Sequence, residues 1–182
     1  MKTRLLVAVS AAALLASGGA IDAAPQHGEH ISGALPEAVR QATRRYQDVA
    51  VAELDGYTRA FGCVSGPTEG AMGVHYVNGS LVDAVLDAEH PEALVYEPLP
   101  NGRLRLVAAE YITPAPVWHM THGPDDTPQL EGHLLNYVPG PNRYGAAAFY
   151  EIHVWAWQHN NHGTFADWNP NVTCAAWQNP MP

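Results

Sequence analysis

The sequence predicts an α+β fold, in which one N-terminal amphipathic helix precedes a mostly antiparallel sheet of four or five strands with long loops. Apolar residues recur at three- and four-residue steps over 36–55, which is the spacing of a helix with one buried face. Later segments are rich in β-branched and aromatic residues and are separated by Gly and Pro, as strands and turns are. A helix followed by a run of strands favours the α+β class.

The first 23 residues have the features of a secretory signal peptide. A short basic start precedes an apolar run over 5–16, and small residues follow it. The run lacks the polar face of an amphipathic helix and is shorter than the roughly 20 apolar residues that cross a membrane. Cleavage after Ala20 or after Ala23 fits the pattern. We therefore expect residues 1–23 to be removed, which leaves a secreted or periplasmic protein without a membrane anchor.

Residues 24–34 are polar and contain Gly, and we expect them to form a flexible leader before a single globular domain over 35–182. A domain of that length buries a core of ordinary size. The chain has 18 Asp and Glu residues against 9 Lys and Arg, for a formal net charge of −9. This charge is repelled by phosphate backbones and anionic lipid surfaces, so nucleic acid is not an expected partner.

Cys63 and Cys174 are the two cysteines of the chain. An even number of cysteines in an exported protein indicates a disulfide, because that compartment is oxidising. The alternatives are two free thiols or a thiolate metal site. We expect one disulfide, which joins the end of the N-terminal region to the C-terminal segment.

Five segments are expected to form strands. The Pro- and Asn-Gly-containing turn at 98–102 predicts a hairpin between its two flanking strands. Pro114 and Pro116 end the longer strand of that hairpin, and residues 119–129 are expected to be loop. The Asn- and Pro-rich tail from Gly163 is expected to be irregular chain, held down by its aromatic residues and the disulfide. The expected strands are 74–77, 93–96, 103–112, 130–138 and 146–157.

Four of these strands carry a His or a Glu that can point to one face of the sheet. The two-residue period of a strand places Glu110 on an apolar face, where a carboxylate needs a positive partner, a metal or a proton. If the four faces coincide, His75, Glu110, His133 and His153 converge. Three imidazoles and a carboxylate suit a transition metal such as zinc, copper or iron. A shared ion requires the ring nitrogens of His75 and His153 to lie within about 7 Å of each other.

A metal-dependent enzyme is a further possibility. It would need an open coordination position and a nearby general base, for which Glu97 and Glu151 are the candidates. The chain has no G-x-S-x-G, H-E-x-x-H or C-x-x-C motif and no phosphate-binding glycine loop with Lys, so no motif assigns a reaction.

The structural interpretation of the same residues gives each an ordinary role. His75 caps a loop, His153 bonds to a backbone carbonyl, and Glu110 forms an ion pair with an arginine. Three His-x-x-His pairs lie in expected loops, where the spacing fixes little geometry. The pairs are at 27 and 30, 119 and 122, and 159 and 162, and the arginines open to Glu110 are Arg103, Arg105 and Arg143.

The aromatic residues of the later part of the chain suggest a different function. They are able to line a pocket for a small apolar or carbohydrate ligand, which would make the protein a metal-free binding module. The alternative is that they fill the core of a small sheet. The residues are Trp118, Trp155, Trp157, Trp168, Trp177, Tyr137, Tyr144 and Tyr150.

Five stretches of sequence follow one another in a distinctive order. They are MGVHYVN at 72–78, PEALVYEP at 91–98, EYI at 110–112, FYEIHVWAW at 149–157 and FADWNP at 165–170. With these motifs the chain resembles a group of uncharacterised secreted bacterial proteins over nearly all of the expected domain. The resemblance implies export and a single domain. It implies no activity and no site residues, because none is established for the group.

Overall fold

The computed structural model describes residues 33–178 and has an α+β architecture. Its main sheet has six strands in the order β1-β2-β3-β4-β8-β7, and each neighbouring pair is antiparallel. Two short strands, β5 and β6, form a separate antiparallel pair. The bounds are β1 Thr58–Ser65, β2 Ala71–Val77, β3 Ala93–Pro98, β4 Leu104–Pro114, β5 Gln129–Leu130, β6 His133–Leu134, β7 Asn136–Val138 and β8 Phe149–Val154.

Three helical segments occupy the region where one continuous helix over 36–55 was expected. They are α1 Ala34–Thr43, the 3₁₀ segment η1 Arg44–Gln47 and α2 Val49–Leu54. The interruption lies at Asp48, whose backbone is extended and whose carboxylate accepts the N–H of Ala50 at 3.1 Å. An Asp side chain that bonds to the backbone two residues later starts a new helix more readily than it continues an old one.

The sheet has one strand more than expected, because β1 was not predicted. The sequence of β1 has no clear two-residue alternation, because its first three residues are exposed and its register against β2 shifts twice, so its two faces do not alternate regularly between core and solvent. The predicted hairpin is confirmed: β3 pairs with β4, and the N–H of Leu99 donates to the carbonyl of Arg103 across the turn.

Two predictions after β4 were wrong. Residues 119–129 are not all loop, because α3 (Ala115–His122) begins directly after Pro114 and carries Pro116 in its first turn, where a proline is tolerated. The single strand expected over 130–138 is divided among β5, β6 and β7. Glu131 and Gly132 have positive φ values of 48° and 83°, which turn the chain sharply between β5 and β6.

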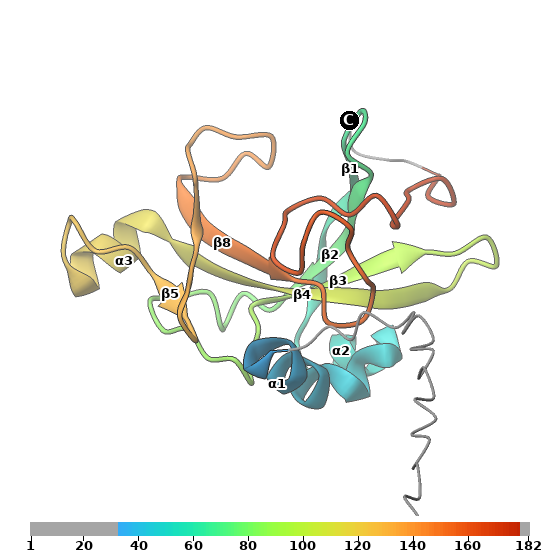
Figure 1. Cartoon of the computed structure of the whole chain (residues 1–182), viewed down its shortest axis with the longest axis horizontal. Coiled ribbons are helices and arrows are strands. Elements are labelled where there is room, and N and C mark those ends of the chain that lie inside the picture. Colours follow the sequence, from blue (N-terminus) through green and yellow to red (C-terminus); the bar gives the residue numbers. More distant parts are fainter. Residues whose placement is uncertain (1–32, 179–182) are drawn as a thin grey trace, which may run out of the picture.

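Figure 1 shows α1 and α2 along one side of the sheet. Leu35 and Val39 of α1 pack in a buried cluster with apolar residues of β4 and β8, such as Tyr111 and Ile152. Trp155 lies in a second buried cluster, and its indole Nε1 donates to the carbonyl of Ala166 in the C-terminal segment. That segment is irregular chain, apart from a single bridge between Asn169 and Ala71.

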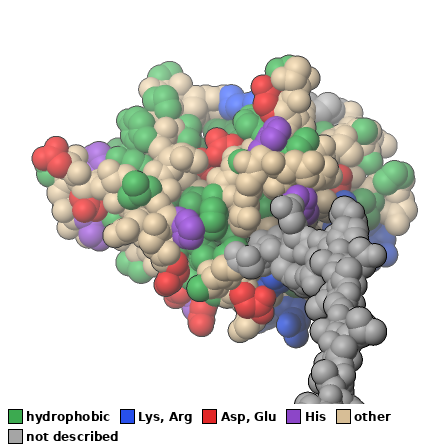
Figure 2. All heavy atoms as spheres, in the orientation of Figure 1, with side chains coloured by type: hydrophobic (Ala, Val, Ile, Leu, Met, Phe, Trp, Pro, Cys, Tyr) green, Lys and Arg blue, Asp and Glu red, His purple; other side chains and the backbone are tan. Residues whose placement is uncertain are grey.

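The predicted disulfide between Cys63 and Cys174 is confirmed, and it ties the C-terminal segment to β1. The predicted signal peptide (1–23) and most of the predicted leader (24–34) lie outside the described residues. Within residues 33–178, every helix is too short or too polar to cross a membrane. On the face seen in Figure 2, acidic and hydrophobic side chains are interspersed, and arginines lie at a few places.

Candidate metal centre

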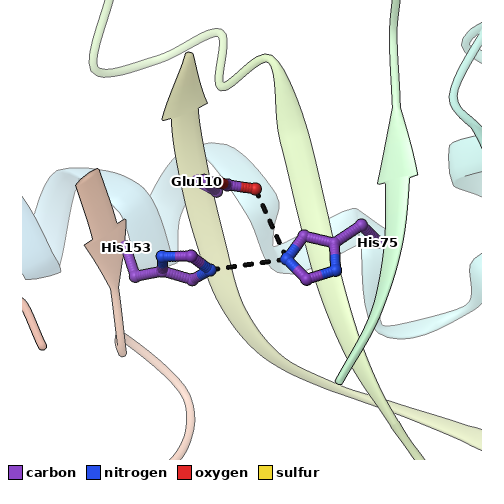
Figure 3. Close-up of side chains that lie close together, drawn as sticks. All are labelled: His75, Glu110 and His153. Carbon is purple, nitrogen blue, oxygen red and sulfur yellow. Dashed lines mark hydrogen bonds and ion pairs between the residues drawn. The ribbon is translucent and has the colours of Figure 1, made fainter. Parts of the chain in front are cut away.

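Donor atoms of His75, Glu110 and His153 meet over the inner strands of the sheet (Figure 3). Nε2 of His75 lies 3.4 Å from Nε2 of His153 and 3.4 Å from Oε2 of Glu110. The three donor atoms all lie within 4.8 Å of one another. The two nitrogens are therefore well inside the limit of about 7 Å for a shared metal ion.

The register of the strands explains why these residues meet. One row of paired residues crosses four strands and consists of Val77 (β2), Ala93 (β3), Glu110 (β4) and His153 (β8). His75 lies two positions before Val77 and therefore on the same face. The backbones of β2 and β4 are roughly 10 Å apart because β3 runs between them. The side chains of His75 and Glu110 therefore reach over β3. On β3, Ala93 pairs with Glu110 and Val95 pairs with His75, so the two side chains meet diagonally across these positions.

The three side chains are almost completely removed from water, with exposed fractions of 4 % for His75, 6 % for Glu110 and 1 % for His153. Burial, together with the charge on His153, lowers the pKa of His75 to about 3. Burial raises the pKa of Glu110 to about 7, although the positive charge of His153 opposes this. Burial by itself would lower the pKa of His153, but the carboxylates of Glu110 and Glu151 raise it to about 9.

At neutral pH the metal-free site therefore holds a protonated His153 and a neutral His75. The contact between His75 and Glu110 is then not an ion pair, because the imidazole carries no charge. Two imidazole nitrogens and a carboxylate oxygen that face one another have the composition of a metal-ligand set.

His153 is held from its far side by Glu151. Its Nδ1 lies 2.9 Å from Oε2 of Glu151, a carboxylate that is itself buried. Asn136 Nδ2 donates to Oε1 of Glu151 at 3.4 Å and to Oδ1 of Asp167 at 3.1 Å. Histidine ligands of metals commonly donate their second ring N–H to a carboxylate, which fixes the tautomer and the orientation of the ring. This bond leaves Nε2 of His153 as the nitrogen directed at His75 and Glu110.

The other nitrogen of His75 is less well supported. Within the described residues, Nδ1 of His75 has no hydrogen-bond partner of normal geometry, although the backbone of Gly73 lies near enough to raise the pKa of the ring slightly against the effect of burial. Nδ1 of His75 thus lacks an orienting hydrogen bond of the kind that Glu151 gives to Nδ1 of His153.

A second group of ligand types shares His153. Donor atoms of Glu151, His153 and Asp167 also lie within 4.8 Å of one another. The pKa of Asp167 is raised by burial and by the neighbouring Glu151, whereas the hydrogen bond to His153 keeps the pKa of Glu151 lowered in spite of burial. Because Glu151 already accepts the Nδ1 hydrogen bond, this group orients His153 and competes poorly for an ion of its own.

Two cavities reach the cluster from different sides. A cavity of about 340 Å³ has mostly apolar walls and contacts His75 and Glu110. A more polar cavity of about 280 Å³ contacts Glu110 and His153, with Asp167 at its wall. Glu110, Tyr144 and Phe149 line both cavities, so the two cavities are neighbours at the cluster.

Of the other predicted site residues, His133 and Glu97 lie away from the cluster and Glu151 lies at it. His133 belongs to β6, outside the main sheet, and its ring packs on Phe165 with the centroids 4.0 Å apart. It is not part of either donor group, because the break between β5 and β6 takes it away from the common face. Glu97 pairs with Arg105, one of the arginines proposed for Glu110, and accepts the N–H of Thr173 at 3.1 Å. Of the two candidate bases, Glu151 is at the cluster and Glu97 is not among its donors.

Sequence reasoning missed Asp167 and Asn136, and it named Tyr144 as an aromatic residue able to line a pocket but did not relate it to the histidines and Glu110. Asp167 lies in the irregular C-terminal segment and Tyr144 in the loop before β8, where no periodicity relates them to the sheet. Asn136 is the partner of Glu151 across β7 and β8, a pairing that becomes evident once the register is known. No periodic signal in the sequence relates either of the two loop residues to the cluster.

The tryptophans do not form one aromatic pocket in the described part of the chain. Trp155 is completely buried in the core, and Trp118 is buried on α3 with its Nε1 bonded to Asp126. Trp168 lines the polar cavity, and Trp177 lines a separate open groove with Arg59. Of the predicted aromatic residues, Tyr144 lines the 340 Å³ cavity, together with Phe61 and Phe149, which were not among those predicted.

Comparison with known proteins found no family model that matches the chain, and no significant match among curated proteins or solved structures. The class of site is therefore defined by its geometry: a buried cluster of two histidines and one glutamate on the face of an antiparallel sheet, with a carboxylate behind one histidine.

Proposed function

We propose that this is an exported metal-binding protein in which His75, Glu110 and His153 hold one divalent transition-metal ion. The observation that carries the proposal is the spacing of the donor atoms. Zinc–nitrogen and zinc–oxygen bonds are about 2.0–2.2 Å long, so neighbouring ligands of a tetrahedral ion are about 3.4 Å apart. Both distances from Nε2 of His75, to Nε2 of His153 and to Oε2 of Glu110, are 3.4 Å.

The donor set favours zinc among the candidate ions. Two imidazoles and one carboxylate form a ligand set used by catalytic zinc sites, and tetrahedral spacing suits an ion with no preference of its own for another geometry. Copper and iron use the same donor types with ligands at right angles, which would bring the donor atoms closer together. If the purified protein contains copper or iron, the proposed identity of the ion changes and the proposed ligands stay the same.

Three protein ligands leave one coordination position of a tetrahedral ion free, and the cluster borders two cavities. A structural zinc site uses all four positions, whereas a site that binds or transforms a small molecule keeps one open. The proposed centre is therefore of the second kind, and a metal-dependent enzyme is included in the proposal. In that role Glu151 is a positioning residue, because its carboxylate is bonded to His153.

The test is elemental analysis of protein purified without a histidine tag from the compartment into which it is exported. Wild-type protein is expected to contain about one metal ion per chain, because buried donors of this type bind tightly at neutral pH. The double variant His75→Ala, His153→Ala is expected to contain almost none. The matched control is His90→Ala. His90 is exposed, pairs with Asp87 and is not one of the donors of the cluster.

Two results would contradict the proposal. One is a wild-type protein without metal whose melting temperature does not change when zinc, copper or iron is added. The other is metal that remains in the double variant but is lost from His90→Ala, which would place the ion on the surface.

Export is proposed on separate grounds. The basic, apolar and small-residue segments of 1–23 support it, and a disulfide between Cys63 and Cys174 is typical of an oxidising compartment. The mass of the mature protein tests this proposal: it should correspond to a chain that begins after Ala20 or Ala23. A full-length chain recovered from the cytoplasm would contradict it.

The 340 Å³ cavity also supports a second candidate, a metal-free module that binds a small apolar ligand. The two candidates differ in one measurement. A metal-free module would bind its ligand equally well before and after treatment with a chelator, whereas a metal centre would not.

A further inference from the structure

The apolar cavity next to the cluster has the form of a ligand site with one polar end. Its volume of about 340 Å³ lies at the small end of the range for small-molecule sites. Most of its walls are hydrophobic side chains, such as Phe61, Val82, Ile112 and Phe149. Polar side chains enter it at His75, Glu110 and Tyr144, and the described lining contains no Lys or Arg.

The charge at the polar end sets the chemistry of the ligand. A divalent ion with two neutral imidazoles and the carboxylate of Glu110 has a net charge of about +1, by simple addition of ligand charges. A single anionic group at the open position would neutralise it. Because the lining offers no other cation, the remainder of such a ligand must be uncharged, since an unpaired charge among apolar walls is costly.

Tyr144 supplies a hydrogen-bond donor at the same end of the cavity. Among the described residues, the partner of its hydroxyl is the sulfur of Met72 at 3.5 Å, and a thioether is a weak acceptor. The hydroxyl is therefore able to turn to a stronger acceptor. Tyr144 lines both cavities that reach Glu110, which places its side chain beside the cluster.

We propose that the cavity binds a small molecule with an apolar body and one singly charged, metal-ligating head, in which the head takes the open position of the ion and accepts a hydrogen bond from Tyr144. Carboxylates, hydroxamates and phenolates are heads of this class. The inference rests on the proposed function, because the head binds to the proposed metal ion. The body, in contrast, is selected by the walls of the cavity.

The experiment uses two probes with the same head, acetohydroxamate and benzohydroxamate, titrated by calorimetry into the zinc-loaded full mature protein. Benzohydroxamate is expected to bind at least about tenfold more tightly, because its phenyl ring leaves water for the apolar walls. Tyr144→Phe is expected to weaken both probes by about three- to tenfold, as the loss of one hydrogen bond does. Metal content should be unchanged in this variant.

Val82→Trp fills the cavity from the loop between β2 and β3 and is expected to remove the advantage of benzohydroxamate while acetohydroxamate still binds. Its matched control is Val85→Trp in the same loop, because Val85 is 67 % exposed and does not line the cavity. Ile112→Trp fills the cavity from β4 and provides a second test if Val82→Trp lowers the melting temperature.

The outcomes separate this inference from the proposed function. Protein that holds zinc but binds both probes equally, or binds neither, overturns the inference and leaves the metal centre standing. Protein that binds none of zinc, copper and iron overturns both. An unchanged preference for benzohydroxamate in both cavity-filling variants shows that the ring lies elsewhere and also overturns the inference.

Discussion

His75 and His153 are 78 positions apart in the chain, yet their Nε2 atoms lie 3.4 Å apart in a buried site. The two residues come from β2 and β8, which are separated in the sheet by β3 and β4. With the pKa of His153 raised and that of His75 lowered, the protonated ring of His153 donates its Nε2–H to the neutral ring of His75. A bound metal ion would take the place of the proton between these two nitrogens.

The first prediction concerns Glu151, which orients His153 without belonging to the proposed ligand set. Glu151→Gln replaces a charged acceptor with a neutral one of the same shape, so the Nδ1–H bond weakens and the nitrogen facing the ion becomes less basic. Loss of such a partner typically lowers metal affinity by about 10- to 100-fold. Competition with a chromogenic zinc chelator measures the change. Glu89→Gln, at an exposed position, should have wild-type affinity; equal affinity for zinc in the two variants would show that Glu151 has no orienting role.

The second prediction concerns Ala93, the residue of β3 that pairs with Val77 of β2 and with Glu110 of β4 on the face of the cluster. Ala93→Leu places a larger side chain in the row between β2 and β4, and we expect it to lower zinc affinity at least about tenfold by holding the donors apart. Ala109→Leu is the matched control, because Ala109 is equally buried on β4 but points to the opposite face.

Both variants are expected to lose about 1–3 kcal/mol of stability through overpacking, so the melting temperature reports the shared effect and the zinc titration reports the specific one. A control variant that loses zinc as completely as Ala93→Leu would contradict the role assigned to Ala93.

The third prediction is a pH dependence of stability that arises from Glu92. This side chain is 1 % exposed and its Oε2 accepts the N–H of Ile112 at 3.0 Å. Burial raises its pKa from 4.5 to about 8, although the hydrogen bond from Ile112 opposes this. The folded protein therefore binds this proton more tightly than the unfolded chain does. The stabilisation is fully present below about pH 4.5 and is lost as the pH rises through about 8.

Glu92→Gln keeps the acceptor oxygen and removes the titration. Relative to wild type, the free energy of unfolding of the variant should rise between pH 4.5 and 8, by at most about 1.4 kcal/mol per pH unit. Urea unfolding at several pH values measures this difference, in which the other titrating groups cancel. A difference that is constant with pH would show that Glu92 is ionised in the folded protein.

The fourth prediction concerns the disulfide, which closes a loop of more than a hundred residues between β1 and the C-terminal segment. The double variant Cys63→Ser, Cys174→Ser is expected to lose about 2–5 kcal/mol of stability, mainly because its unfolded state is less constrained. Unfolding in urea, without reductant, measures the loss. Wild-type protein treated with reductant should reach a similar stability; a variant as stable as oxidised wild type would rule out this contribution.

Much of the sheet follows from the sequence, for local physical reasons. A high content of β-branched and aromatic residues marks β3, β4 and β8, and the turn at 98–102 pairs the first two of them. The two-residue period of a strand places Glu110 on one face of β4, and it places Glu151 and His153 together on one face of β8. The pairing of Cys63 with Cys174 follows from their number. Each of these inferences depends on neighbours in the chain or on a simple count.

The site itself was decided by the tertiary structure. Periodicity assigns a residue to a face but does not say which strands are neighbours. The meeting of side chains from β2, β4 and β8 above β3 is therefore a property of strand order and register. The same limit explains why one expected ligand was wrong and why two residues were not placed at the cluster. His133 lies off the common face because Glu131 and Gly132 turn the chain. Tyr144 and Asp167 lie at the cluster but belong to loops, where long-range packing sets the position of a residue and the local sequence carries no periodic signal.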